Sequence, residues 1–246
     1  MSASVSSPAA PSEPRVALVL GGTGAVGRAV LHELSVRGIP AWFTYHSSAE
    51  RAAELSSRYG FPGLPVDFAD ATSTSALFAE LDRRGFVPDV LIHCTAVSQA
   101  LPLAEVSPGD FTRTLSINAQ SAFLACQWLA ARRPSDCDVV FVGALTGGQS
   151  LPLPVPYAAT QGMLPAMVMA LAHELGPRRF RVNLAALGLL DEGLSQTLDP
   201  KRRADYLTFS ALRRVGTTRD AAGTIVWLAL ENRAIHGKVV ALNGGI

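Results

Sequence analysis

An apolar run that ends in closely spaced glycines is the feature that most constrains the fold of this chain. Residues 16–20 are all apolar, and the segment LVLGGTGAVGR leads from them into a helical pattern. Such a short run is typical of a strand buried on both faces of a parallel sheet. Glycines between strand and helix let the backbone approach a pyrophosphate, which the free N–H groups of the helix start attract. The alternative is a tight turn without ligand. We predict a dinucleotide-phosphate loop made by Gly21, Thr23, Gly24, Val26 and Gly27.

The rest of the chain continues the alternation of strands and helices. Strands are expected at residues 16–20, 41–45, before Asp67, and at 90–94, 139–143, 180–184 and 238–242. Helices are expected at 25–36, 49–59, 75–84, 111–131, 157–175 and 218–230, with an irregular stretch at 188–210. This order predicts an α/β protein with a Rossmann-type, doubly wound parallel sheet flanked by helices. We expect residues 14–246 to form one domain, and residues 1–13, which are rich in Ser, Ala and Pro, to form a disordered leader.

Composition restricts the partners of this domain. The 246 residues are 48% hydrophobic with a net charge of +1, which gives no electrostatic basis for binding nucleic acid or an anionic membrane. No apolar run approaches the roughly 18 to 20 residues of a membrane span, and no secretory signal is present. Cys94, Cys126 and Cys137 lack metal-ligand spacing, so we expect no metal. The sequence favours a cytoplasmic protein that binds a small molecule.

Two further positions bear on the nucleotide. The expected second strand runs into Thr-Tyr-His-Ser-Ser, where an NAD-selective site usually has an acid that binds the ribose 2′-OH and repels a 2′-phosphate. Because His46 and Ser47 stand there instead, NADP(H) is favoured over NAD(H). The alternative is a polar loop in which Ser47 or Ser48 caps the next helix. Asp67, after the third strand, is a candidate hydrogen-bond acceptor for the adenine amine.

Three segments carry a family resemblance. They are YAATQGMLPAMVMALAHELGPRRFRVN, SINAQSAFLACQ and the closing GKVVALNGG. With them, residues 15–246 resemble the short-chain dehydrogenase/reductase family, most closely the bacterial β-ketoacyl carrier-protein (3-oxoacyl-ACP) reductases. The resemblance implies that Tyr157 protonates a substrate carbonyl as hydride arrives from the nicotinamide. It also implies that Asn118 is the family's catalytic asparagine, holding a water or a backbone group. The alternatives are a packed aromatic side chain for Tyr157 and helix-to-backbone hydrogen bonding for Asn118.

The chain departs from the family pattern around this site. Ala144 stands where the family has the serine that orients the carbonyl, and Gln161 stands where it has the lysine that lowers the tyrosine pKa. Without the lysine, the pKa of Tyr157 is expected near its usual value of about 10, and Gln161 is expected to bind a ribose hydroxyl. Ala25 replaces the middle glycine of the loop. Three polar residues are candidate substitutes for the missing serine: His93, Thr146 and Gln149.

Two further departures lie outside the catalytic positions. Leu187 replaces the proline of the family's Pro-Gly pair after the sixth strand. Pro165 lies inside the expected 157–175 helix, where it removes a backbone hydrogen bond and should kink the helix.

The leading functional hypothesis is an NADPH-dependent reductase acting on a ketone of an acyl-carrier or polyketide-type intermediate. Loss of the serine and lysine motivates two alternatives. One is a catalytically impaired subunit that forms a hetero-oligomer with an active paralogue. The other is a non-redox dehydratase, isomerase or cyclase that uses Tyr157 as an acid. The resemblance also implies a homotetramer or homodimer built on the Tyr157 helices and the last strand.

Overall fold

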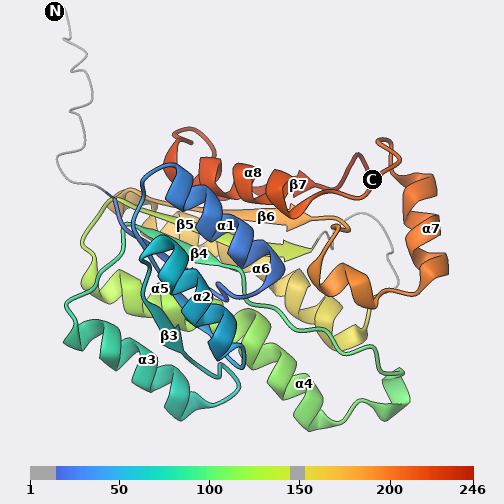
Figure 1. Ribbon diagram of the computed structural model, residues 1–246, viewed down its shortest axis with the longest axis horizontal. Helices are drawn as coiled ribbons and strands as arrows, with labels where there is room; N and C mark the ends of the chain where they lie inside the picture. Colours follow the sequence, from blue (N-terminus) through green and yellow to red (C-terminus); the bar gives the residue numbers. More distant parts are fainter. Residues whose placement is uncertain (1–14, 145–152) are drawn as a thin grey trace, which may run out of the picture.

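The protein forms one seven-stranded sheet in which every neighbouring pair of strands is parallel (Figure 1). The computed structural model describes residues 15–144 and 153–246. The strand order is β3-β2-β1-β4-β5-β6-β7, as expected for a doubly wound sheet. The strands are β1 (Ala17–Leu20), β2 (Ala41–Tyr45), β3 (Gly63–Pro65), β4 (Val90–His93), β5 (Cys137–Ala144), β6 (Phe180–Leu187) and β7 (Val239–Leu242). The predicted leader, Thr146 and Gln149 lie outside the described residues.

Helices cover both faces of the sheet. One face packs against α1 (Ala25–Val36), α2 (Ala49–Tyr59) and α8 (Thr218–Leu230). The other face packs against α3 (Ala71–Arg83), α5 (Ser121–Arg132) and α6 (Val155–Leu175). Side chains on the two faces of the central strands therefore pack into two separate cores. Because both faces are covered, these strands are continuous apolar runs rather than alternating ones.

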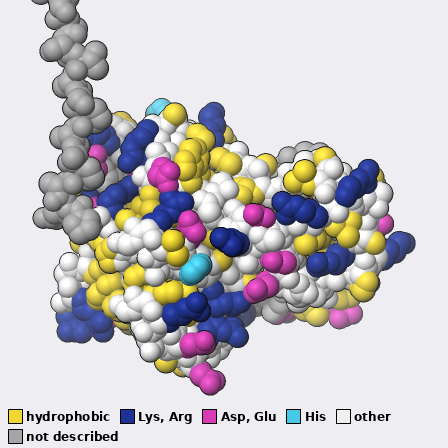
Figure 2. All heavy atoms as spheres, turned by 45° about the horizontal axis from the view of Figure 1, so that its top comes forward, with side chains coloured by type: hydrophobic (Ala, Val, Ile, Leu, Met, Phe, Trp, Pro, Cys, Tyr) yellow, Lys and Arg dark blue, Asp and Glu magenta, His cyan; other side chains and the backbone are white. Residues whose placement is uncertain are grey.

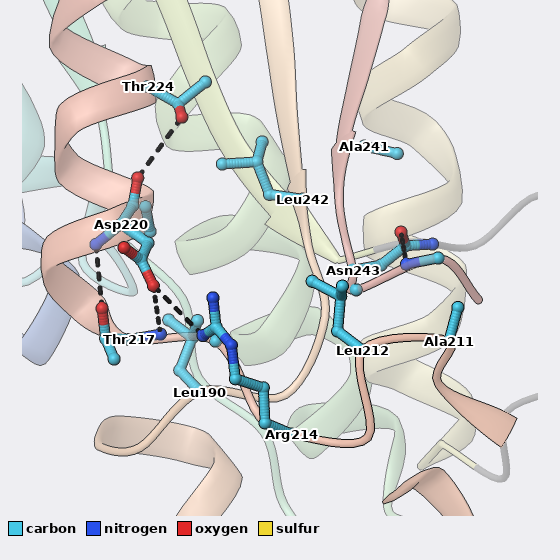
Figure 3. Close-up of a pocket in the computed structure, with 14 residues that line it drawn as sticks. Leu190, Ala211, Leu212, Arg214, Thr217, Asp220, Thr224, Ala241, Leu242 and Asn243 are labelled. Atoms are coloured by element: carbon cyan, nitrogen blue, oxygen red, sulfur yellow. Dashed lines mark hydrogen bonds and ion pairs between the residues drawn. The ribbon is translucent and has the colours of Figure 1, made fainter. Parts of the chain in front are cut away.

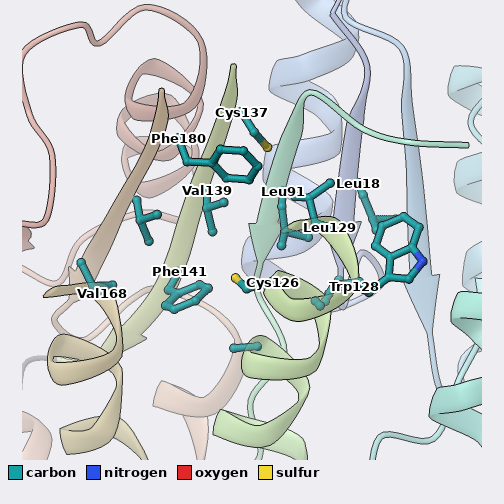
Figure 4. Close-up of a cluster of buried hydrophobic side chains, with 14 of the residues drawn as sticks. Leu18, Leu91, Cys126, Trp128, Leu129, Cys137, Val139, Phe141, Val168 and Phe180 are labelled. Atoms are coloured by element: carbon teal, nitrogen blue, oxygen red, sulfur yellow. The ribbon is translucent and has the colours of Figure 1, made fainter. Parts of the chain in front are cut away.

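The core under α5 and α6 contains several of the largest fully buried side chains. Phe141 of β5 and Phe180 of β6 are completely or almost completely buried there, with Leu129 of α5 and Val168 of α6 (Figure 4). Full burial of each such side chain contributes about 1.5 to 3 kcal/mol of transfer free energy. This packing fixes α6 against β5 and β6, which determines where the first turn of α6 lies at the carboxyl ends of the strands.

Two helical predictions are corrected by the structure. The single helix expected at 111–131 is α4 (Pro108–Leu115), a π-helical turn (Ser116–Gln120) and then α5. The stretch 188–210, expected to be irregular, contains a 3₁₀ turn (Gly193–Thr197) and α7 (Pro200–Phe209). Asp199 caps α7 by accepting hydrogen bonds from the first-turn N–H groups, and Pro200 opens the helix, which is a favourable start signal.

Several boundaries follow from local chemistry. Asp70 accepts a hydrogen bond from the Thr72 N–H, so α3 begins four residues before the expected start. Helix α6 continues through Pro165, so the proline interrupts the hydrogen-bond ladder without ending the helix. Short 3₁₀ turns at Leu103–Glu105 and Gly176–Arg178 complete the described elements.

One helix contradicts the expectation that no segment is long and apolar enough to span a membrane. The segment Val155–Arg178, which contains α6, is long and apolar enough to cross a membrane by length and composition, with a mean hydropathy of 1.2. Here it is a layer of the domain, because Leu164, Val168 and Ala172 pack into the core against the sheet. Within the described residues, no group of three His, Cys, Asp or Glu side chains is arranged to hold a metal ion.

A charged cluster closes the amino edge of the sheet, opposite the phosphate loop. The buried Asp138 carboxylate of β5 pairs with Arg15 and, at 2.6 Å, with Arg181. Arg15 also donates hydrogen bonds to the carbonyls of Asp89 and Ala229. On the face in Figure 2, basic and acidic side chains are interspersed.

Candidate active site

The glycine-rich turn between β1 and α1 has the geometry of an anion-binding loop. Gly21 has φ +80°, a conformation that side-chain-bearing residues rarely adopt. A β-carbon on Gly27 would lie 2.2 Å from the Gly21 carbonyl oxygen, so only glycine fits where the helix packs on the loop. Helix α1 begins after Gly24 with no side-chain cap and no acidic residue in its first turn. Its first N–H groups are therefore available to a phosphate.

The segment after β6, residues 188–197, lies across this loop and is called the strap below. Glu192 forms a 2.7 Å ion pair with Arg28 of α1, and Arg28 also donates to the Thr23 carbonyl. A β-carbon on Gly193 would lie 3.1 Å from the Ala25 methyl group, so the strap contacts Ala25 closely. The other side of the strap is tied to α8, because Asp191 accepts a hydrogen bond from the Thr218 N–H. Glu192 and Arg28 are not among the site residues predicted from the sequence.

A cavity of about 600 Å³ lies between the loop, the strap and the first turns of α6. It brings together four of the predicted positions, Gly24, Val26, Tyr157 and Gln161, with Ala144 at the end of β5. Its wall also includes Cys94, Ser98, Leu153, Leu187, Leu189, Leu198 and Arg202, among others. Gly21, Thr23 and Gly27 belong to the adjoining turn but do not line the cavity. The cavity thus joins an anion-binding helix start to a phenol.

Tyr157 lies in the first turn of α6 and is half-buried. Burial raises the pKa of Tyr157 to about 12, above the value near 10 that was expected from the sequence. The expectation was wrong because it considered the missing cation and not the desolvation of the phenolate. The phenol is therefore neutral at physiological pH, which is the form that donates a proton.

Gln161 lies one helical turn after Tyr157 and faces the end of β5. Its side-chain oxygen Oε1 accepts a 2.8 Å hydrogen bond from the Ala144 N–H. One end of the amide therefore ties α6 to β5. The Nε2 end has no hydrogen-bond partner among the described residues, which leaves it able to donate to a ligand hydroxyl, as the sequence analysis proposed for a ribose.

Asn118 is buried behind the cavity on the π-helical turn and does not line it. Its side chain accepts a hydrogen bond from the Val97 N–H (2.8 Å) and donates to the Val97 carbonyl (2.9 Å) and to Thr160 Oγ1 (3.1 Å). Thr160 in turn donates to the carbonyl of Tyr157. Asn118 therefore holds a backbone group, one of the two roles considered for it, and connects the loop after β4 with the Tyr157 helix.

His93 is not a pocket residue, which corrects one of the candidate substitutes for the missing serine. Its side chain is buried under the sheet, with Nε2 2.7 Å from the Ser121 hydroxyl. Burial lowers the pKa of His93 to about 4, so the ring is neutral at pH 7. The prediction failed because His93 ends β4 on the face that packs against α5.

The predicted adenosine-side residues lie beyond the cavity. His46 and Asp67 follow β2 and β3 and face each other, with Nε2 and Oδ2 3.6 Å apart. Asp67 also accepts a hydrogen bond from the Ala69 N–H. Ser47 is exposed, and Ser48 occupies the N-cap position of α2 without a side-chain hydrogen bond to the helix.

A second cavity of about 460 Å³ lies between the start of α8 and the residues after β7 (Figure 3). Its polar side chains pair with one another: Asp220 contacts Arg214 at 3.3 Å, and the Asp220 N–H donates to Thr217 Oγ1. None of the predicted site residues lines it. We therefore place the functional site in the larger cavity.

Comparisons with known proteins agree with this geometry. The profile of the family described as enoyl-(acyl carrier protein) reductase matches residues 22–246. The 3-oxoacyl-[acyl-carrier-protein] reductase MabA of Mycobacterium bovis is 25% identical, covering 96% of this chain and 94% of its own length. The L-2,3-butanediol dehydrogenase of Corynebacterium glutamicum is 27% identical, covering 94% and 98%. A blue fluorescent protein from a metagenomic library, solved with NADPH, is 28% identical with a TM-score of 0.85, covering 94% and 97%.

The chain belongs to the short-chain dehydrogenase/reductase family. It is an oxidoreductase-family domain of the Rossmann type, and its fold and glycine-rich turn fit a nicotinamide dinucleotide. The fit is steric as well as electrostatic, because the space beside Gly27 is closed to any side chain and the α1 N–H groups lack a protein cap.

Proposed function

We propose that the protein is an NADPH-dependent reductase of a ketone on an acyl-carrier or polyketide-type intermediate. The observation that carries the proposal is the single cavity that connects the uncapped start of α1 with the Tyr157 phenol. The loop of Gly21, Gly24 and Gly27 would bind the diphosphate, and Gln161 Nε2 would donate to a ribose hydroxyl. The bound cofactor would supply the hydride.

The chain's own part in the reaction is proton donation and orientation. Tyr157 would give its proton to the carbonyl oxygen, and the raised pKa keeps that proton on the phenol until the oxygen becomes negative. In this proposal Ala144 and Gln161 replace the serine and lysine of the family. Because glutamine stands where the family has its lysine, position 161 offers no cation to stabilise a phenolate. Alcohol oxidation needs a phenolate as base, so the site favours reduction.

NADP(H) is preferred over NAD(H) in this proposal because no carboxylate stands at the end of β2. His46 and Ser47 are exposed there, and neither carries a fixed negative charge. Introducing an acid with Ser47→Asp should therefore weaken NADPH binding more than NADH binding, since it repels the 2′-phosphate.

The experiment that tests the proposal is a titration with NADPH and NADH, followed by nicotinamide fluorescence. Turnover of a β-ketoacyl thioester is then compared between the wild type and Tyr157→Phe. We expect tighter binding of NADPH and a loss of about 10²- to 10⁴-fold in kcat for Tyr157→Phe. Absence of nucleotide binding would refute the redox function and leave the non-redox alternative.

We also propose that a second copy of this chain covers the outer face of α4, α5 and α6. Large apolar side chains are exposed on these helices, namely Phe111, Phe123, Val155, Met163 and Met169. A cytoplasmic homodimer or homotetramer would bury them. Sedimentation of the wild type and Met169→Lys tests this proposal, with a smaller assembly expected for the variant. Copurification of a second reductase-like chain would instead support the hetero-oligomer.

A further inference from the structure

The cavity contains a hydroxyl group that the protein itself does not use. Four hydroxyl-bearing residues line it: Ser98, Tyr157, Ser195 and Thr197. Ser195 Oγ accepts a 2.9 Å hydrogen bond from the Leu190 N–H, and Thr197 Oγ1 donates at 2.8 Å to the Leu194 carbonyl. Both therefore stabilise the strap. Within residues 15–144 and 153–246, the half-buried Ser98 hydroxyl has no hydrogen-bond partner.

The backbone beside Ser98 is held rigidly against the Tyr157 helix. Asn118 binds both the N–H and the carbonyl of Val97, the preceding residue, at 2.8 and 2.9 Å. The same side chain donates to Thr160, which donates to the carbonyl of Tyr157 at 2.9 Å. One connected network thus positions the residue before Ser98 and the backbone of Tyr157. Such preorganisation is what a group that acts on a reacting atom requires.

The proposed reaction needs a donor of this kind. When hydride reaches a ketone carbon, negative charge develops on the carbonyl oxygen, and a second donor beside the proton donor stabilises it. Ala144 offers only a methyl group in the cavity wall, and His93 is buried elsewhere. A serine hydroxyl can donate one hydrogen bond and can rotate to suit its acceptor.

We propose that Ser98 donates a hydrogen bond to the substrate carbonyl oxygen beside Tyr157, in the role that Ala144 cannot fill. This inference rests on the proposed reductase function. Bound NADPH would supply the hydride for the new C–H bond. Tyr157 would give its proton to the carbonyl oxygen to form the new O–H bond, and the resulting phenolate would take a proton from solvent. Ser98 keeps its own proton throughout and orients the oxygen.

The test compares Ser98→Ala with Ser98→Thr, which keeps the hydroxyl, and with the double variant Ser98→Ala/Ala144→Ser. For each we would measure kcat/KM with a β-ketoacyl thioester and the Kd of NADPH. We expect Ser98→Ala to lose about 10²-fold in kcat/KM, as for removal of one oxyanion donor, with an unchanged Kd of NADPH. Ser98→Thr and the double variant should regain activity. Wild-type kcat/KM in Ser98→Ala, or an equal loss of NADPH affinity, would overturn the proposal.

A second measurement separates Ser98 from the redox function. The ¹³C chemical shift of a labelled ketone carbonyl, bound in the presence of NADP⁺, reports hydrogen bonds to its oxygen whether or not turnover occurs. A shift that returns toward the value in water in Ser98→Ala, but not in Ser98→Thr, supports the hydrogen bond. If the wild type oxidises no NADPH yet shows this dependence, the reductase function fails and the Ser98 contact stands. A shift indifferent to both substitutions refutes the contact.

Discussion

Gly27→Ala is the substitution whose effect follows most directly from the structure. The added β-carbon would lie 2.2 Å from the Gly21 carbonyl oxygen and 2.9 Å from the Gly22 Cα. These are backbone atoms, so no side-chain rotation relieves the contact. The loop and the start of α1 must separate by roughly 1 Å to restore ordinary van der Waals distances. Overpacking of this kind costs about 1 to 3 kcal/mol in folding free energy.

The same displacement moves the N–H groups that are proposed to bind the diphosphate. Because 1.4 kcal/mol corresponds to a factor of ten in an equilibrium constant, we expect the Kd of NADPH to rise at least tenfold, measured by fluorescence titration. Thermal unfolding measures the stability loss independently.

Gly223→Ala is the matched control for this substitution. Gly223 lies inside α8 with nothing within 4 Å of a new β-carbon, so its replacement should stabilise the helix by about 0.5 to 1 kcal/mol. Unchanged NADPH affinity and Tm in Gly27→Ala would refute the reasoning.

Three further predictions concern charges and pH. His93 is buried with a pKa lowered to about 4, so between pH 6.5 and 4 the unfolded chain takes up a proton that the folded protein does not. The free energy of unfolding should therefore fall by about 3 kcal/mol as the pH drops from 6.5 to 4. Urea unfolding should show a flatter pH profile for His93→Asn. Asp138→Asn leaves Arg15 and Arg181 without their buried partner and should cost about 3 to 5 kcal/mol in urea unfolding; a loss below 1 kcal/mol would contradict the role of the amino-edge cluster. Glu192→Gln removes a carboxylate beside the phosphate loop and releases Arg28. Because this ion pair is exposed, the free energy of unfolding should change by less than about 1 kcal/mol. Stopped-flow and equilibrium fluorescence should show that NADPH binds severalfold more tightly.

The sequence allowed the fold to be predicted where the burial pattern is simple. The strand at residues 41–45 and the helices at 25–36, 49–59 and 218–230 have the predicted bounds, because continuous apolar strands and amphipathic helices are local signals. Helix α7 was missed because its face is mostly polar, although Asp199 and Pro200 are a readable start signal. The π-helical turn at Ser116–Gln120 has no such signal, since it inserts one residue into an otherwise regular pattern.

The site was predictable in part, for a different physical reason. Gly24, Val26, Tyr157 and Gln161 lie together because the glycine turn and the tyrosine segment carry motifs with fixed positions in the fold. His93 was misplaced because the direction of a side chain at a strand end depends on the register of the sheet. Ser98 and Glu192 carry no motif that sequence reasoning could use. Their place in the cavity wall depends on the hydrogen bonds between Asn118 and Val97, the residue before Ser98, and on the ion pair between Glu192 and Arg28. Both interactions join residues that are distant in the chain.

The amino-edge cluster has a practical consequence for attaching the protein to a surface or to a label. Arg15, the first described residue, is fixed by Asp138, Asp89 and Ala229 at the edge of the sheet away from the cavity. The C-terminus lies beside α7 (Figure 1), where the Asn243 carbonyl accepts a hydrogen bond from the Tyr206 hydroxyl. A fluorophore attached at the surface beside Arg15 would therefore leave the mouth of the cavity open. The same group joined after Ile246 would crowd the helix that forms one side of that mouth.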